Sequence, residues 1–145
     1  MQALQIEDLD LFEGWSEGDE GMRVRAGFPI SSGTGAKSTA VVYFELEPGR
    51  HLGRHTDSAE EVLVVLSGVG TATVGDEQTP VRAGTLAVVP ALLPHSVENT
   101  GHETLRVVGV FSSSTVLSVF DDPMEPFATR YFATPMIDEE ATVTA

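Results

Sequence analysis

The chain has 145 residues, of which 41% are hydrophobic, so it is long and apolar enough for one packed domain and is not a disordered protein. Its 22 acidic residues exceed its 8 basic ones, and a net charge of −14 repels nucleic-acid backbones and anionic membranes, so we expect neither as a partner. The absence of cysteine excludes disulfides, thiolate metal sites and cysteine nucleophiles.

Residues 1–21 are acidic and interrupted by glycine, with Leu9, Leu11, Phe12 and Trp15 as candidate anchors. We expect an N-terminal arm here rather than part of the main domain. The first ten residues carry no basic region and no long apolar run, so we expect no signal peptide and a cytoplasmic location. No apolar run in the chain approaches the roughly 18 residues of a membrane span.

Short segments rich in β-branched and aromatic residues follow, separated by glycine and proline. They predict strands over residues 22–28, 39–47, 62–66, 68–75, 86–89, 95–97, 105–111 and 115–120. Many short strands at regular spacing are typical of an all-β sandwich or barrel, and we expect one β-barrel domain over residues 22–120. Pro123, Pro126 and Pro135 predict an extended tail over residues 121–145, with one further strand near 130–132.

Two histidines and two acidic residues mark a candidate metal site. His55 and Asp57 are two residues apart, so in an extended strand they project from one face, about 6.6 Å apart along the backbone. Glu61 begins an apolar strand, and His95 follows a second apolar strand. Because the chain has only four histidines, four metal-capable side chains in these two segments are a concentrated signal.

The segments around these residues resemble the two motifs of the cupin superfamily. The first motif has Gly, His, His, Glu and Gly at fixed spacing, and this chain has at those positions Gly49, His55, Asp57, Glu61 and Gly68. The second motif has Gly, Pro, Gly, His and Asn, and the matching residues are Gly84, Pro90, Leu92, His95 and Asn99. The resemblance covers residues 49–99 and implies a jelly-roll β-barrel of the cupin type.

The resemblance also implies one divalent metal ion held by His55, Asp57, Glu61 and His95. Asp57 stands where the family usually has its second histidine, and a set of two imidazoles and two carboxylates favours Fe(II), Mn(II) or Zn(II) over copper. Leu92 stands where the family has a glycine, and we expect it to change the conformation of that turn rather than the ligand set. Three alternatives to this four-ligand site stay open. In the first, Glu61 is a catalytic general base instead of a ligand. In the second, the barrel binds a small molecule without a metal, and in the third it is purely structural.

The other two histidines are weaker candidates. In an extended strand His51 lies about 13 Å from His55, so direct metal contact requires a bulge at Gly53. His51 can also line the mouth of the pocket or lie at the surface. His102 lies in a predicted turn, where we expect it to be exposed.

The predicted strands also describe the pocket. If Glu61 faces inward, Leu63 and Val65 share its face, and the strands over 39–47 and 105–111 offer further apolar faces. Such a lining suits a small, mostly apolar organic molecule. We therefore expect metal-dependent chemistry on such a molecule, and dioxygenase-like oxidation is the reaction that the resemblance most commonly implies. A metal-dependent lyase or isomerase and a non-catalytic binding module are the alternatives. We expect a homodimer, because pairing between copies covers exposed strand edges.

Overall fold

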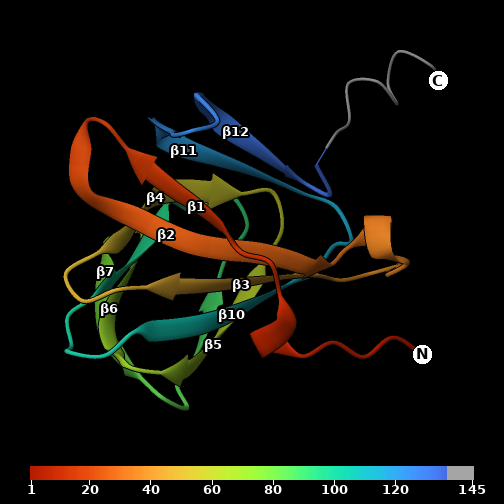
Figure 1. The fold of residues 1–145 in the computed structure, drawn as a ribbon, viewed down its shortest axis with the longest axis horizontal. Helices are drawn as coiled ribbons and strands as arrows, with labels where there is room; N and C mark the ends of the chain where they lie inside the picture. Colours follow the sequence, from red (N-terminus) through yellow and green to blue (C-terminus); the bar gives the residue numbers. More distant parts are fainter. Residues whose placement is uncertain (137–145) are drawn as a thin grey trace.

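Two curved β-sheets face each other in the computed structural model, which describes residues 1–136 (Figure 1). The first sheet contains, in spatial order, β1 (Phe12–Ser16), β2 (Asp19–Ile30), β3 (Ala40–Leu46), β10 (Leu105–Phe111), β5 (Glu61–Ser67) and β8 (Leu86–Val89). The second contains β7 (Glu77–Arg82), β6 (Val69–Val74), β9 (His95–Asn99), β4 (His51–Asp57), β11 (Val116–Met124) and β12 (Thr129–Thr134).

The neighbours within each sheet are antiparallel, and a short parallel pairing of Met22 in β2 with His51 in β4 joins the two sheets. The arrangement confirms the predicted all-β jelly-roll barrel. Two short 3-10 segments (Ile6–Asp8 and Ser32–Thr34) are the helical elements of residues 1–136, and no helix in that range could span a membrane.

The core lies between the sheets because alternate residues of each strand point inward. In β10, four residues are buried and alternate with three that are half-buried. In β5, Leu63 and Val65 are buried on the same face as Glu61, as the strand pattern predicts. The inner faces of the two sheets therefore form one apolar layer with a few polar groups held inside it.

The barrel extends beyond the expected limits of residues 22–120 on both sides. β1 and the first residues of β2 lie inside the segment expected as an arm, and the end of β11 and all of β12 lie inside the segment expected as a tail. The two ends meet where the backbones of Trp15 and Glu125 exchange two hydrogen bonds, of 3.0 and 2.7 Å. Residues 137–145 of the expected tail lie outside the described residues.

Two strands, β1 and β7, were not predicted, and each has a physical reason. Gly14 interrupts the apolar pattern of β1, but a Cβ atom there would overlap Sδ of Met124 on β11. β7 was not predicted either, because it is polar and contains Pro80. It lies at the edge of its sheet, where proline is tolerated because one side of the strand pairs with no other strand of residues 1–136.

Asn99, the last residue of the second motif, has a structural role at one end of the barrel. Its side chain is buried and donates hydrogen bonds of 2.8 Å to the carbonyls of Leu46 and Glu103, and it accepts one of 2.9 Å from the Gly101 amide. These bonds tie the ends of β3 and β9 to the turn that precedes β10. Asn99 therefore satisfies three backbone groups that β pairing leaves free.

The turn before β9 contains a residue in a conformation that glycine favours. Leu92 has a φ of 65°, its side chain is 69% exposed, and its amide donates a 2.8 Å hydrogen bond to the carbonyl of Asp57. Leu92 thus has the left-handed backbone conformation at the position where the motif has glycine. The hydrogen bond from Leu92 to Asp57 links the backbone before His95 directly to β4.

We predict that Asn99→Ala lowers the free energy of unfolding by roughly 2–4 kcal/mol, because it leaves buried backbone groups without partners. Urea denaturation measures this difference. Glu98→Ala, at an exposed neighbouring position of the same strand, is the control and should change stability by less than about 0.5 kcal/mol. Equal losses in the two variants would contradict the structural role of Asn99.

We predict that Leu92→Gly raises the free energy of unfolding by roughly 0.5–1 kcal/mol. The left-handed conformation costs a non-glycine residue about 1–2 kcal/mol, and the greater chain entropy of glycine in the unfolded state offsets part of that gain. Leu92→Ala, which keeps the Cβ atom, should leave the stability nearly unchanged. Destabilisation by Leu92→Gly in the same denaturation experiment would show that the leucine side chain has a stabilising contact.

Candidate metal centre

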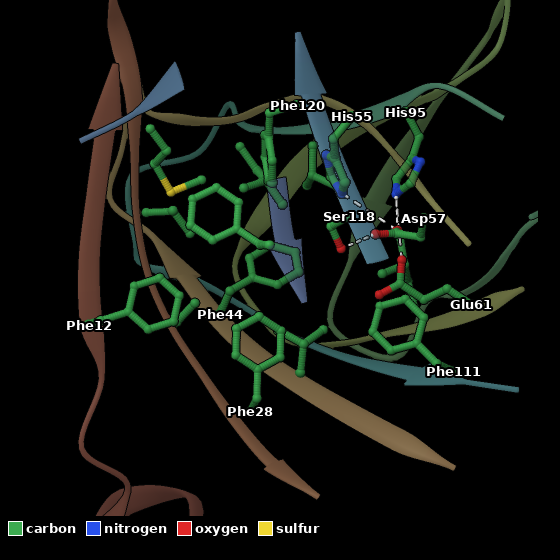
Figure 2. A pocket seen from close by; sticks show the side chains of 18 residues that line it. Phe12, Phe28, Phe44, His55, Asp57, Glu61, His95, Phe111, Ser118 and Phe120 are labelled. Carbon is green, nitrogen blue, oxygen red and sulfur yellow. Dashed lines mark hydrogen bonds and ion pairs between the residues drawn. The ribbon is translucent and has the colours of Figure 1, made fainter. Parts of the chain in front are cut away.

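Four ionisable side chains meet at one end of the cavity between the sheets (Figure 2). β4 supplies His55 and Asp57, β9 supplies His95, and β5 supplies Glu61 from the opposite sheet. His55 and His95 are register partners in the antiparallel pair of β4 with β9, so their rings lie with centroids only 4.2 Å apart. All four residues are at most 6% exposed. The structure thus brings together all four predicted site residues.

Three of the four form a compact group. One ligand atom from each of His55, Asp57 and His95 lies within 4.8 Å of the others. Oδ2 of Asp57 is 3.0 Å from Nε2 of His95 and 3.6 Å from Nε2 of His55. An ion at the usual distance of about 2.0–2.2 Å from each ligand fits between atoms spaced in this way. Glu61 does not belong to the group, although its Oε1 lies 3.6 Å from Nε2 of His95.

The backbone sets which nitrogen each imidazole presents. Nδ1 of His55 is 2.7 Å from the carbonyl of Gly53, and Nδ1 of His95 is 2.9 Å from the carbonyl of Leu93. Because a carbonyl only accepts hydrogen bonds, each Nδ1 carries the proton of the contact. In the neutral ring, Nε2 is then the nitrogen with a free lone pair. This is the arrangement in which a histidine coordinates a metal through Nε2.

Two buried atoms of the group lack a hydrogen-bond partner among residues 1–136: Oδ2 of Asp57 and Nε2 of His95. They lie 3.0 Å apart, which is an ion-pair distance, but they are not aligned as a hydrogen bond. A buried polar atom without a partner costs about 1–3 kcal/mol. A cation between these atoms would satisfy both, so the residues present fit a divalent metal ion.

The charges of the site compensate each other in the absence of an ion. Burial, with the nearby His95, lowers the pKa of His55 to about 4, so this ring is neutral. Burial disfavours the charged forms of Asp57 and His95, but their attraction outweighs it. The attraction between Asp57 and His95 holds the pKa of Asp57 below its ordinary value. Together with Glu61, it raises the pKa of His95 to about 10. A metal ion would replace the proton on His95 as the charge that neutralises Asp57.

Glu61 lies beside this group rather than within it. Burial raises the pKa of Glu61 above the ordinary range of a carboxylic acid. Gly109 on the neighbouring strand β10 leaves the space for it, since a Cβ atom there would overlap Oε2 of Glu61. The preceding residue, Glu60, is exposed. A carboxylate placed here can approach either the metal or a molecule bound next to it.

The other histidines do not join the group. Nε2 of His51 is 2.7 Å from Oδ2 of Asp19, and both residues line a separate polar cleft. Phe120 and Met124 line both this cleft and the apolar pocket, so they form the wall between the two. His51 therefore lines a cleft beside the site and does not contact the candidate ligands. His102 is exposed, as predicted.

The pocket is polar at one end and aromatic at the other (Figure 2). The apolar lining that the strand faces predict is confirmed. Among the described residues, neither lysine nor arginine lines the pocket. Six of the seven phenylalanines of the chain line it, namely Phe12, Phe28, Phe44, Phe111, Phe120 and Phe132. The seventh, Phe127, packs edge-on against Phe12 and Phe132.

Sequence patterns missed the contribution of the chain ends to this site. Oγ of Ser118 on β11 donates a 2.6 Å hydrogen bond to Oδ1 of Asp57, and the ring of Phe120 stacks on His55 at 4.5 Å. The alternation of Val116, Ser118 and Phe120 predicts that they share one face of a strand. It does not reveal that β4 is the neighbouring strand, so their role becomes visible only in the folded chain.

Comparison with known proteins supports the same reading. Residues 42–111 match the family described as the cupin domain. Auxin-binding protein 4 of Zea mays is 30% identical over 132 residues, which cover 80% of this chain and 65% of that protein. Auxin-binding protein 1 of Arabidopsis thaliana is 27% identical over 119 residues, covering 75% and 60% respectively. The matched stretch thus spans less than two thirds of either relative.

Solved structures share the fold. A predicted oxalate decarboxylase from Thermotoga maritima superposes with a TM-score of 0.67 at 23% identity, covering 77% of this chain and 99% of that one. A putative sugar phosphate isomerase from Acidithiobacillus ferrooxidans gives 0.61 at 25% identity, covering 83% and 79%. A polyketide cyclase from Streptomyces resistomycificus gives 0.62 at 20% identity, covering 77% and 78%. Together with the motifs and the barrel, the match over residues 42–111 identifies a cupin domain in this chain.

Proposed function

We propose that this cupin binds one divalent metal ion through His55, Asp57 and His95 and oxidises a small, mostly apolar organic molecule in a dioxygenase-like reaction. The observation that carries the proposal is the compact group of three buried ligands, in which Oδ2 of Asp57 and Nε2 of His95 have no hydrogen-bond partner within residues 1–136. Two histidines and one carboxylate, with open positions beside them, are the ligand set typical of non-haem iron(II) oxygenases.

The residues around the ligands have separable tasks. A bound Fe(II), Mn(II) or Zn(II) ion would supply Lewis-acid activation, and iron or manganese would also supply redox chemistry. We assign Glu61 as the general base, because it lies outside the compact group and is buried, and because burial raises its pKa and so makes the carboxylate a stronger base. The same residues serve a lyase or isomerase if the metal acts only as a Lewis acid.

The aromatic end of the pocket supports the class of molecule. The lining rings and Phe127 behind them form a continuous series of contacts. Phe28 contacts Phe12, Phe12 contacts Phe127, Phe127 contacts Phe132, and Phe132 contacts Phe120, which stacks on His55. Such a surface packs against flat, apolar molecules. Because no lysine or arginine from residues 1–136 lines the pocket, a strongly anionic molecule such as a sugar phosphate lacks a counter-charge there.

Non-catalytic binding of a small molecule is the second candidate. The names of the curated relatives state that they bind auxin, and the aromatic pocket described here suits a binding protein as well as an enzyme. The two functions differ in one observable respect: an enzyme consumes its ligand, whereas a binding module releases it unchanged.

We predict that protein stripped of metal takes up one ion of Fe(II), Mn(II) or Zn(II) per chain, measured by elemental analysis and by competition with a chelator. His95→Ala and Asp57→Ala each remove a ligand and should weaken metal binding by roughly 100-fold or more. Loss of a residue that only orients a ligand already lowers metal affinity by about 10–100-fold. His51→Ala and His102→Ala are the matched controls and should bind the ion like the native chain. Native-like binding in His95→Ala would refute the proposed ligand set.

We predict that the iron-loaded protein consumes oxygen with a member of a panel of diketones, catechols and thiols. Glu61→Gln should keep the ion but slow turnover by about 100-fold or more, the usual contribution of a general base. Glu60→Gln, the exposed neighbour, should turn over normally.

The outcome separates the candidate functions. Product formation without oxygen uptake would assign a lyase or isomerase instead. Tight binding of panel compounds without turnover would assign the binding module.

A further inference from the structure

One buried polar contact of the site comes from outside both sequence motifs. Ser118 is a residue of β11, and its register partner in the antiparallel pairing with β4 is Asp57. Its side chain is buried, and its Oγ donates a hydrogen bond of 2.6 Å to Oδ1 of Asp57. A hydroxyl bonded to a carboxylate at this distance makes a charge-assisted hydrogen bond, which is among the stronger kinds.

The need for this contact follows from the chemistry of the ligands. The two imidazoles carry an N–H donor, so carbonyls two residues earlier on their own segments, Gly53 and Leu93, can orient them. An ionised carboxylate is an acceptor only, so a carbonyl cannot orient it. Asp57 therefore requires a donor, and Ser118 on the adjacent strand provides it. Without that donor, rotation about the last bond of an aspartate side chain is only weakly restricted.

The contact also distinguishes the two carboxylate oxygens. Oδ1 is occupied by Ser118, while Oδ2 faces His95 at 3.0 Å and His55 at 3.6 Å and has no hydrogen-bond partner within the described part of the chain. Dashed lines in Figure 2 join the Asp57 carboxylate to Ser118 and to the two imidazoles. The geometry leaves a single oxygen free to bind an ion.

We propose that Ser118 is a positioning residue of the metal centre, which holds the Asp57 carboxylate so that Oδ2 alone is presented as a monodentate ligand. The inference rests on the proposed function, since it assumes that Asp57 binds the ion. It extends the site to a third strand of the second sheet, β11, which neither motif includes. Where the motif has a histidine, no such donor is needed, so Asp57 and Ser118 act as a pair.

The test measures metal affinity in the folded protein. Metal-free native chain, Ser118→Ala and Ser118→Thr are titrated with Co(II) and with Zn(II) in competition with a chelator. Ser118→Ala should bind about 10–100-fold more weakly, the usual cost of losing a partner that orients a ligand. Ser118→Thr keeps the hydroxyl donor and should bind within about threefold of the native chain, so it separates the lost hydrogen bond from other effects of substitution at this position. Ser16→Ala, a buried serine in the neighbouring polar cleft, is the control and should bind like the native chain.

The Co(II) absorption spectrum is the second readout. Release of Oδ1 allows the carboxylate to bind through both oxygens, so the bands of Ser118→Ala should shift and weaken relative to the native chain, whereas those of Ser118→Thr should not. An affinity of Ser118→Ala within threefold of the native value, with an unchanged spectrum, would overturn the positioning role even if the variant were less stable. A native chain that binds neither ion would instead refute the proposed function, so the two failures are distinguishable.

Discussion

The buried carboxylate of Asp57 is the group around which the site is organised. It is 3% exposed, and a charge removed from water to this extent persists only with compensating partners. Its partners come from three strands that are neighbours in the second sheet. His95 is on β9, His55 is on β4 with Asp57 itself, and Ser118 is on β11. The site is thus a row across the inner face of one sheet, and the opposite sheet covers it with Glu61.

Because the site residues come from three paired strands, the geometry of the site depends on strand register. His55 pairs with His95, and two residues later Asp57 pairs with Ser118. A slip of one residue in β4 would turn both of its ligands to the outer face, because side chains alternate along a strand. The apolar partners of the same strands, packed between the sheets, oppose such a slip. The hydrophobic core therefore fixes the geometry of the polar site, although it contributes no polar group to it.

The strands near the two ends of the chain form part of the aromatic end of the pocket. Phe12 on β1 and Phe120 on β11 line the cavity, and the backbones of Trp15 and Glu125 hold β1 beside β11. The cavity has a charged end built from the motif segments and an aromatic end built partly from the termini. A molecule that fits both ends is apolar over most of its surface and carries one group that can approach a metal ion.

Much of the fold could be predicted from the sequence, because strand alternation with its turn residues and the spacing of the two motifs are both local patterns. Alternation and turn residues predict β10 and β8 with their observed bounds, and the motif spacing brings His55 and His95 together correctly. β1 and β7 escaped because Gly14 and Pro80 serve close packing and a sheet edge, which weakens the local pattern. Ser118 escaped because its importance lies in pairing with β4, about sixty residues earlier, and composition does not encode strand partners.

The most direct test of the account is a crystal structure of the metal-loaded protein, with anomalous diffraction recorded at the absorption edge of the ion. The account predicts one anomalous peak inside the barrel, about 2.0–2.2 Å from Nε2 of His55, Oδ2 of Asp57 and Nε2 of His95. A peak at His51 and Asp19 in the neighbouring polar cleft, or none between the sheets in fully loaded protein, would contradict it.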